Sequence, residues 1–388
     1  MLAGRLIKIR ERIVVMIIGV PKEIKKNEHR VAITPSSAET ITRHGHKVLV
    51  EPGAGNGSGF TDDQYVESGA ELTVRDLLYN KCDMLVKVKE IEEAEYPLLR
   101  EGQIVFAYLH SNAHRDMTEA LLAKGVIGIA CEDIDDAGGS FPLLAPASIL
   151  AGKGAFLAAL HYTQSIYGGP GVLLSRVAGV PTPRIAIIGC GWSGMGAAEL
   201  AASFGNRVTM LDVSKAALER AKNQLPPNAE FLFSNRSNLV DCLRDCDVLI
   251  NCILWDKTRK DHLVNREDLR LMKPSAMIVD VACDEGGAIE TCRSTSHGDP
   301  VYREEGILHY CVDNIPSAFS KTASVTFSAE CLPFILAIAN KGVKTALLED
   351  SHLRRGLSFY YGSLTLLETA EKLAIKYVDA LEAIRMSE

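Results

Sequence analysis

Short apolar runs alternate with amphipathic stretches along the first third of the chain. Segments 36–43 and 116–124 have the apolar spacing of surface helices. Strands that alternate with helices at this interval form βαβ units, so we expect a mostly parallel sheet here. The apolar runs that would form its strands are 17–20, 47–50, 84–88, 104–109 and 126–130.

A second alternating region follows a long stretch of small residues at 147–165, which we expect to be a helix. Glycine- and proline-rich segments at 168–171 and 180–183 lead from this stretch into further alternation. Beyond about residue 320 the pattern is helical to the end and too short for a domain of its own, so we expect it to fold back onto the first region. The strand-length runs of the second region include 231–233, 248–253, 277–281 and 309–312.

The segment 185–196 joins a strand-length apolar run to a helix through Gly189, Gly191 and Gly194, in the spacing G-x-G-x-x-G. The first glycine permits a tight turn, the second lets the backbone approach a pyrophosphate, and the third lets the helix pack close to the strand. The helix N-terminus offers free N–H groups to phosphates. Such spacing alone is often only a glycine turn, but strand, helix and next strand follow in order here. The segment therefore indicates dinucleotide binding.

Asp212 ends the next apolar run, where a ribose-binding acid is expected. A carboxylate accepts hydrogen bonds from a free ribose 2′-OH and repels a 2′-phosphate. Since no arginine follows at once, NAD is favoured over NADP, with Lys215 the one opposing feature. The alternative for Asp212 is an N-cap of the helix that starts near Ser214.

Together these patterns predict an α/β protein with two Rossmann-like domains and parallel sheets. We expect a discontinuous substrate (catalytic) domain at 1–143 plus 320–388 and an NAD-binding Rossmann domain at 144–319. Two connections between the domains would make a hinged cleft. The length of 388 residues suits about two domains, and 47% hydrophobic with 23% charged residues is ordinary for a globular protein.

Charge and hydropathy exclude other classes. The formal net charge of −7 and the lack of a Lys/Arg run argue against nucleic-acid binding. We expect no membrane span, because no apolar segment approaches the roughly 20 uncharged residues needed. The ten cysteines lie mostly in strand-like runs, and Cys242 and Cys246 lack further metal ligands, so we expect no metal site. A reducing cytoplasm fits best, and the basic segment 1–15 is expected to be an extended start rather than a targeting peptide.

Polar side chains stand where several expected strands end. Taken singly, each has an ordinary explanation. Arg30 could form a surface salt bridge, and the two lysines, which share one strand face, could be edge-strand charges. The histidine could be a hydrogen-bonded interior residue, and Asp284 could be a turn former. Together they supply cations, a proton carrier and a carboxylate. They are Arg30, Lys87, Lys89, His110, Asp280 and Asp284.

Several motifs resemble the alanine dehydrogenase family, which is related to the nucleotide-binding subunit of transhydrogenase and, more distantly, to saccharopine dehydrogenases. The resemblance runs in order from Met16 nearly to the C-terminus and implies two Rossmann-like domains, the first built from both ends of the chain. The motifs are GVPKE at 19–23, NEHRVAITP at 27–35, EPGAG at 51–55, LVKVKE at 85–90, YLH at 108–110, PLLAP at 142–146, VDVACDEGG at 279–287 and CVDNIP at 311–316.

The resemblance implies roles for these side chains. Arg30 would clamp the substrate carboxylate, where a guanidinium fork fits well. Lys89 would bind the 2-oxo or carboxylate oxygen and stabilise charge there. His110 would be the acid/base, assisted by Asp284 at the amine or water. Contacts to NAD are implied for Gly189, Gly191, Gly194, Asp212, Ser148, Ser234 and Asn314.

The chain departs from the family pattern where substrate choice would be affected. Ala147 and Cys131 stand where the family has larger residues, and Ile149 replaces an acid. After His110, where the family has small and apolar residues, this chain has the mostly polar segment Ser-Asn-Ala-His at 111–114. A larger and more polar pocket is one interpretation of these changes, and neutral drift is the other.

Three functions follow from the sequence. The leading one is an NAD-dependent amino acid dehydrogenase that reversibly deaminates L-alanine or a related L-amino acid to the 2-oxo acid and ammonia. The second is an opine- or saccharopine-type reductase that joins a 2-oxo acid to an amino acid amine. The third is a cofactor-binding subunit that works with a partner, against which His110 speaks. The resemblance also implies a homo-oligomer, a dimer or hexamer.

Overall fold

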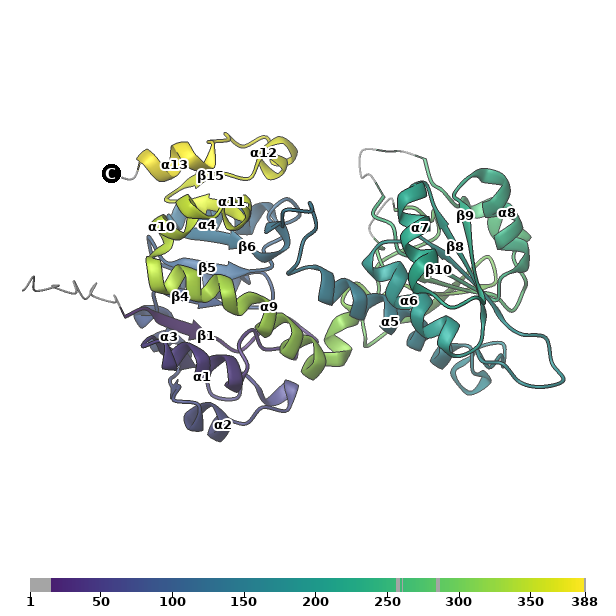
Figure 1. Cartoon of the computed structure of the whole chain (residues 1–388), viewed down its shortest axis with the longest axis horizontal. Coiled ribbons are helices and arrows are strands. Elements are labelled where there is room, and N and C mark those ends of the chain that lie inside the picture. The colour runs from purple at the N-terminus through teal and green to yellow at the C-terminus, as the bar shows by residue number, and fades with distance from the viewer. Residues whose placement is uncertain (1–14, 256–258, 260, 284–286, 387–388) are drawn as a thin grey trace, which may run out of the picture. The chain divides into compact units, whose positions relative to one another are not determined.

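The chain divides by its internal contacts into two compact units (Figure 1). Unit 1 comprises Met1–Leu144 and Ser320–Glu388, and unit 2 comprises Ala145–Phe319. The computed structural model describes residues 15–255, 259, 261–283 and 287–386. Each unit has its own mostly parallel sheet, so the expected α/β fold with two Rossmann-like domains is confirmed.

The sheet of unit 1 has the strand order β15-β14-β6-β5-β4-β1-β2-β3. The six strands from the first part of the chain pair in parallel, as expected. Helices α1 (Pro35–Arg43) and α4 (Arg115–Lys124) confirm the two expected helical segments. The parallel strands are β1 (Ile17–Val20), β2 (Lys47–Val50), β3 (Glu71–Leu72), β4 (Met84–Val86), β5 (Ile104–Ala107) and β6 (Ile127–Ala130).

The C-terminal part of unit 1 is not wholly helical, so that expectation was wrong. Strands β14 (Leu357–Tyr360) and β15 (Ser363–Leu364) form a hairpin, and β14 pairs antiparallel with β6. Gly362 in the hairpin turn has a φ of 81°, which favours glycine. At Gly128 of β6 a side chain would collide with Phe359, because a Cβ there would lie 2.4 Å from that ring. The remaining helices of unit 1 are α2 (Asp62–Glu67), α3 (Arg75–Lys81), α9 (Ser320–Lys341), α10 (Val343–Glu349), α11 (Ser351–Arg355), α12 (Leu367–Leu373) and α13 (Ala380–Met386).

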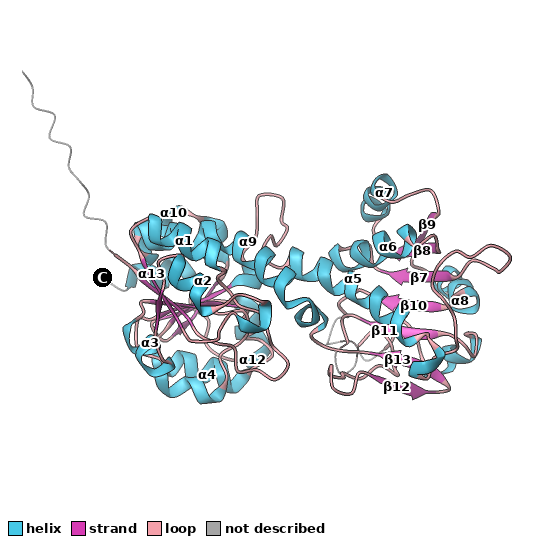
Figure 2. Cartoon of the chain, turned by 90° about the horizontal axis from the view of Figure 1, so that it is seen from below, coloured by secondary structure: helices cyan, strands magenta, loops and turns pink. Residues whose placement is uncertain are grey.

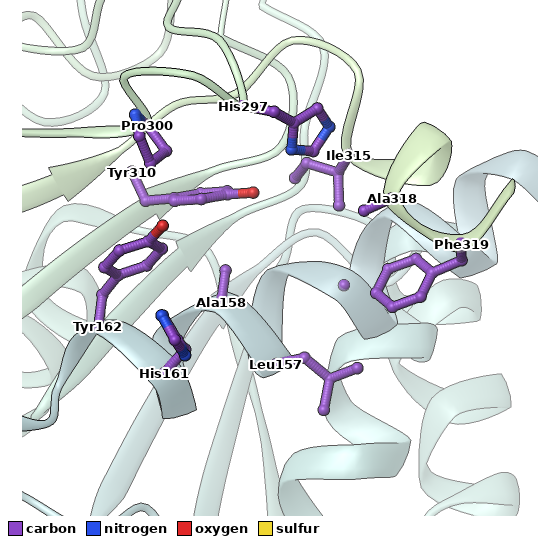
Figure 3. A pocket seen from close by; sticks show the side chains of 11 residues that line it. Leu157, Ala158, His161, Tyr162, His297, Pro300, Tyr310, Ile315, Ala318 and Phe319 are labelled. Carbon is purple, nitrogen blue, oxygen red and sulfur yellow. The ribbon is translucent and has the colours of Figure 1, made fainter. Parts of the chain in front are cut away.

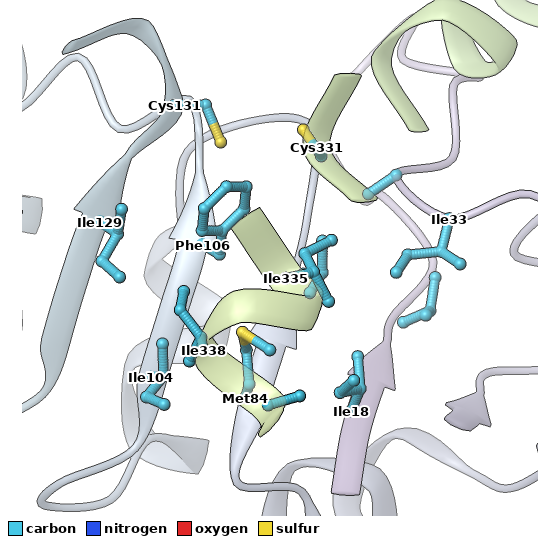
Figure 4. Packing of buried hydrophobic residues seen from close by; sticks show 14 of the residues in the cluster. Ile18, Ile33, Met84, Ile104, Phe106, Ile129, Cys131, Cys331, Ile335 and Ile338 are labelled. Atoms are coloured by element: carbon cyan, nitrogen blue, oxygen red, sulfur yellow. The ribbon is translucent and has the colours of Figure 1, made fainter. Parts of the chain in front are cut away.

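Helix α9 packs into the core of unit 1 (Figure 4). Its side chains Phe327, Cys331, Ile335 and Ile338 are buried there, which stabilises the fold by roughly 2 kcal/mol for each large aliphatic group. By length and composition the segment Ile315–Lys341 would be long and apolar enough to cross a membrane, contrary to the sequence expectation. Such a segment also meets the needs of a core helix, and the burial of this face explains its apolar character.

Polar groups of α9 fix the loop that follows β1. The hydroxyl of Ser324 accepts the N–H of Val31 at 2.9 Å, and the hydroxyl of Ser328 accepts the N–H of Thr34 at 3.0 Å. Thr34 is in turn the N-cap of α1. The last part of the chain therefore sets the position of the segment that contains Arg30.

Unit 2 has the strand order β12-β13-β11-β10-β7-β8-β9, and Figure 2 shows the strands β7, β10, β11, β13 and β12 side by side. The strands are parallel except β12. The chain runs outward from β7 to β9 and then returns to β10, so the strand order reverses beside β7, as at a dinucleotide site. The strands are β7 (Arg184–Ile188), β8 (Arg207–Asp212), β9 (Ala229–Phe233), β10 (Val248–Asn251), β11 (Met277–Asp280), β12 (Val301–Glu304) and β13 (Ile307–Tyr310).

The small-residue helix of unit 2 packs closely against a helix of the same unit. Helix α5 (Ala145–Tyr162) contacts α6 (Trp192–Ser203), and a Cβ at Gly152 would lie 1.8 Å from the carbonyl oxygen of Ser193. A Cβ at Gly196 would likewise meet the carbonyl of Ile149 at 2.5 Å. Only glycine fits at these crossings, which explains the composition of the helix. The other helices of unit 2 are α7 (Lys215–Gln224) and α8 (Arg236–Asp245).

Candidate active site

Arg30 in unit 1 is a buried cation held by a local carboxylate. Arg30 is only 4% exposed, so it does not form the surface salt bridge that was the ordinary explanation for it. Nε and Nη2 donate to the two oxygens of Glu28 at 2.7 and 2.6 Å. Burial lowers the pKa of Arg30, but the paired Glu28 outweighs this effect and keeps it raised. The guanidinium is thus charged and fixed in orientation before any substrate arrives.

The two lysines after β4 have different surroundings, and β4 is a central strand, which excludes a role as edge charges. Lys87 is fully buried, and its Nζ donates to Glu95 at 2.6 and 2.8 Å and lies 3.4 Å from Glu23. Lys89 keeps 13% of its side chain exposed and lies 3.6 Å from Glu90. Burial is the main cause that lowers the pKa of Lys89. Lys87 is therefore a structural cation, and Lys89 is the one available to a ligand.

His110 follows β5 in a strained conformation, with a φ of 43°. The main-chain N–H of His110 donates to Glu132 at 2.5 Å, and the ring nitrogen Nδ1 lies 3.6 Å from the same side chain. The side chain is 38% exposed, so it is not a wholly interior histidine. Burial of the ring, followed by the nearby Lys89 ammonium, lowers the pKa of His110 to about 4. The imidazole is therefore neutral at pH 7 and ready to accept a proton.

Glu132 is a site residue to which the sequence analysis gave no role. Its carboxylate also accepts the N–H of Leu109 at 3.0 Å, and burial, followed by Asp133, raises its pKa to about 8. The pairing of Ala107 with Ala130 in the parallel sheet brings the segments after β5 and β6 together. An acid two residues beyond a strand end was the only signal in the sequence.

Asp280 and Asp284 stood near the end of one expected strand. Asp280 ends β11 and is buried, accepting from Asn251 Nδ2 at 2.9 Å. Burial is the main cause that raises its pKa to about 7. Asp284 lies outside the described residues.

The glycine turn of unit 2 has the conformation that the spacing requires. Gly189 has a φ of 100°, and a Cβ at Gly194 would lie 1.8 Å from the carbonyl oxygen of Gly189. At Gly191, the N-cap of α6, a Cβ would meet nothing within 4 Å. The first and third glycines are therefore required by the fold itself, whereas the second leaves open space at the helix N-terminus where a phosphate would lie.

Asp212 joins the end of β8 to the glycine turn. Its Oδ2 accepts the N–H of Cys190 at 2.7 Å and its Oδ1 accepts the N–H of Ser214 at 2.8 Å. Ser214 is the N-cap of α7, so the alternative that gave this role to Asp212 was wrong. Ser234 lies beside Asp212, since its N–H donates to the Asp212 carbonyl at 2.9 Å.

The other two predicted cofactor contacts lie elsewhere in unit 2. Ser148 is on the first turn of α5 and is partly exposed. Asn314 follows β13, and its carbonyl accepts from Nε2 of His297 at 2.9 Å. A pocket of about 210 Å³ in unit 2 contains neither of them: it is lined from α5, the 297–300 loop and the segment 310–319 (Figure 3).

Family models match both parts of the chain. The model described as "Alanine dehydrogenase/PNT, N-terminal domain" matches residues 19–151, and "Alanine dehydrogenase/PNT, C-terminal domain" matches residues 155–366. The chain belongs to the alanine dehydrogenase/PNT family. The expected family is thereby confirmed, as is the enzyme class of oxidoreductases that act on the CH–NH2 group of donors.

Relatives within the alanine dehydrogenase/PNT family match nearly the whole chain. Alanine dehydrogenase of Methanococcus maripaludis is 41% identical over 371 residues, covering 95% of this chain and all of that protein. The enzyme of Bacillus subtilis is 39% identical, covering 95% and 98%. A solved structure of an L-alanine dehydrogenase has a TM-score of 0.88 at 37% identity, covering 92% and 99%. A transhydrogenase from Sinorhizobium meliloti shares the fold, with a TM-score of 0.78 at 24% identity, covering 90% and 99%.

The departures from the family pattern have mixed outcomes. Cys131 is fully buried in the core of unit 1 near Cys331, so it does not enlarge an open pocket (Figure 4). Ser111 is buried and bonds to the Thr369 hydroxyl at 2.8 Å. His114, in contrast, is 44% exposed, and its Nε2 lies 3.5 Å from Glu90, beside Lys89. Of these three positions, only His114 is placed to influence substrate binding.

Proposed function

We propose that the chain is an NAD-dependent alanine dehydrogenase, which interconverts L-alanine, water and NAD+ with pyruvate, ammonium and NADH. The observation that carries the proposal is the group formed by Arg30, Lys89 and His110 in unit 1. Arg30 lies close enough to Lys89 to depress its pKa, and Lys89 does the same to His110. Two cations beside a neutral imidazole suit a small anionic oxo acid that must exchange protons.

In the proposed reaction Arg30 binds the substrate carboxylate with its fixed guanidinium, and Lys89 donates to the 2-oxo oxygen. The negative charge of the bound acid raises the pKa of His110 from about 4, so the ring holds a proton during the reaction. In the direction of amination His110 gives that proton to the departing hydroxyl of the carbinolamine, and water is lost. Asp284 is proposed to hold the amine or water.

The glycine turn supports NAD as the cofactor. Open space at Gly191 admits a pyrophosphate, and the Asp212 carboxylate is anchored by two N–H groups with lone pairs left for ribose hydroxyls. When bound, the nicotinamide supplies hydride transfer to or from the substrate Cα. We propose Gly189, Gly191, Gly194, Asp212, Ser148, Ser234 and Asn314 as its contacts.

The test is the oxidation of NADH with a panel of 2-oxo acids, each supplied with ammonium and separately with amino acids as amine donors. Rapid oxidation with pyruvate and ammonium supports the proposal, and NADPH should be a poor substitute. Activity restricted to larger oxo acids or to amino acid donors would instead support an opine- or saccharopine-type reductase. That alternative has lost one support, because Cys131 is buried in the core.

Two further parts of the proposal concern the setting of the enzyme. All ten cysteines are free thiols, which favours a reducing cytoplasm.

We also propose a homo-oligomer, dimer or hexamer, for which sedimentation velocity provides the measurement. Copurification with a different protein would favour the third function, a cofactor-binding subunit.

A further inference from the structure

Glu90 is a buried carboxylate with three basic side chains around it. Its Oε2 accepts from Lys25 Nζ at 3.0 Å, while its Oε1 lies 3.5 Å from Nε2 of His114 and 3.6 Å from Nζ of Lys89. The residue is 5% exposed. Lys25 comes from the loop after β1, Lys89 from the segment after β4, and His114 from the start of α4. One carboxylate thus organises three separate parts of unit 1.

The contact with Lys89 differs from the contact with Lys25. At 3.0 Å the Lys25 ammonium forms a hydrogen bond, whereas 3.6 Å is an ion pair without one. Within the described residues, Nζ of Lys89 has no hydrogen-bond acceptor. The nearby Glu90 fixes where this ammonium lies without taking one of its hydrogen bonds. The group is oriented and still able to bind a ligand oxygen.

The main chain of Lys89 is fixed by a second carboxylate. Glu23 Oε1 accepts the N–H of Val88 at 2.7 Å and of Lys89 at 3.2 Å. The other oxygen of Glu23 lies 3.4 Å from the buried Lys87 ammonium. Glu23 thus fixes the main chain of Lys89, and in the part of the chain that the structure describes its ammonium pairs with Glu90.

We propose that Glu90 is a positioning residue for the reaction, which holds the Lys89 ammonium where it binds the oxygen of a 2-oxo acid. The inference rests on the proposed function. If Glu90 faced Lys89 alone, a buried carboxylate would compete with the substrate for that ammonium. Lys25 donates a hydrogen bond to Glu90 and offsets its negative charge, so Lys89 is held without being fully neutralised.

The charges around Lys89 give this proposal a measurable signature. Burial lowers its pKa most, Lys25 and Arg30 lower it further, and Glu90 and Glu28 raise it. Glu90 also raises the pKa of His110, against the effects of burial, Lys89, His114 and Lys25. Without Glu90, Lys89 should lose its proton at a lower pH. Binding of an oxo acid should then fail at a lower pH as well.

The first variant is Glu90→Gln, which keeps the shape and removes the charge. We expect the KM for pyruvate to rise about tenfold or more, with the KM for NADH changed less than about twofold. The alkaline limb of kcat/KM for pyruvate should move down by about one pH unit. Glu90→Asp, which retains the charge, should recover most of the loss. The matched control is Glu119→Gln, which breaks an exposed ion pair with Arg115 and should behave as wild type.

A second variant predicts the opposite sign and guards against misfolding of the first. Lys25 is 33% exposed, and Lys25→Gln removes a charge that lowers the pKa of Lys89. In this variant the alkaline limb of kcat/KM for pyruvate should therefore move to higher pH. The proposal would be overturned if the alkaline limb of kcat/KM for pyruvate stayed unchanged in both variants. It would also be overturned if Glu90→Gln raised the KM for pyruvate and the KM for NADH equally. If wild type shows no oxidation of NADH with any 2-oxo acid, the proposed function fails instead.

Discussion

The carboxyl group of Glu132 accepts the main-chain N–H of His110 at 2.5 Å and lies 3.6 Å from Nδ1 of the same residue. A non-glycine residue at a φ of 43° costs free energy, and this contact offsets part of the cost. The same side chain also lies next to the imidazole ring of His110. Glu132 therefore fixes the backbone of the proposed acid/base and lies beside its ring.

The stability of the protein should depend on pH through Glu132. The pKa of this carboxyl is raised from 4.5 to about 8 by burial, so the folded chain keeps a proton that the unfolded chain releases. Stability from this group is complete below about pH 4.5 and is lost as pH rises to about 8, by at most about 1.4 kcal/mol per pH unit. Urea unfolding at several pH values should show a flatter curve for Glu132→Gln than for wild type. Parallel curves would contradict the assignment.

Replacing His110 by Ala should abolish turnover and leave NADH binding intact, because the ring belongs to the substrate group of unit 1 and the glycine turn belongs to unit 2. Steady-state rates and NADH fluorescence titration measure the two effects. In wild type, kcat/KM for L-alanine should fall at acid pH with a limb near pH 4, because deamination needs the neutral imidazole to accept a proton and the pKa of the free ring is about 4. Turnover retained in the variant would remove His110 from the mechanism.

Arg30→Lys should weaken the binding of the oxo acid, because a lysine cannot repeat the two-pronged contact of a guanidinium. Loss of a charge-assisted hydrogen bond costs about 1.5–3 kcal/mol, so we expect kcat/KM for pyruvate to fall about 10- to 100-fold. Arg115→Lys is the control, since Arg115 is exposed and pairs with Glu119 on α4. Comparable losses in the two variants would indicate an effect unrelated to the carboxylate.

The two glycines Gly191 and Gly194 should differ when each is replaced by Ala. A Cβ at Gly194 collides with the Gly189 carbonyl, so the variant should lose stability, whereas a Cβ at Gly191 meets nothing. Gly191→Ala should therefore keep the melting temperature of wild type and bind NADH much more weakly. Thermal unfolding and fluorescence titration separate these outcomes. Normal NADH affinity in Gly191→Ala would place the pyrophosphate elsewhere.

Features that depend on local sequence could be predicted, and those that depend on the register of the sheet could not. The glycine turn and Asp212 follow from spacing within one βαβ unit, and their geometry agrees with it. Glu132 becomes a neighbour of His110 only because β5 and β6 pair in parallel. Glu90 gains its partners from loops remote in sequence.

Two errors have physical causes of the same kind. The hairpin of β14 and β15 was hidden by the helical segments on either side of it, and its pairing with β6 lies more than two hundred residues away along the chain. Cys131 was expected to enlarge a pocket because it stands where the family has a larger residue. The side chains of adjacent residues point in different directions, and that of Cys131 points into the core.

The pairing of β14 with β6, together with the seat of α9 in the core of unit 1, has a consequence for synthesis on the ribosome. Unit 2 is one continuous stretch and is complete as soon as residue 319 has emerged. Unit 1 begins first but waits for the last part of the chain, and until then the apolar surface beneath α9 has no cover. The order of translation and the order of folding are thus reversed, and the nascent chain is most exposed to aggregation while its second unit is already formed.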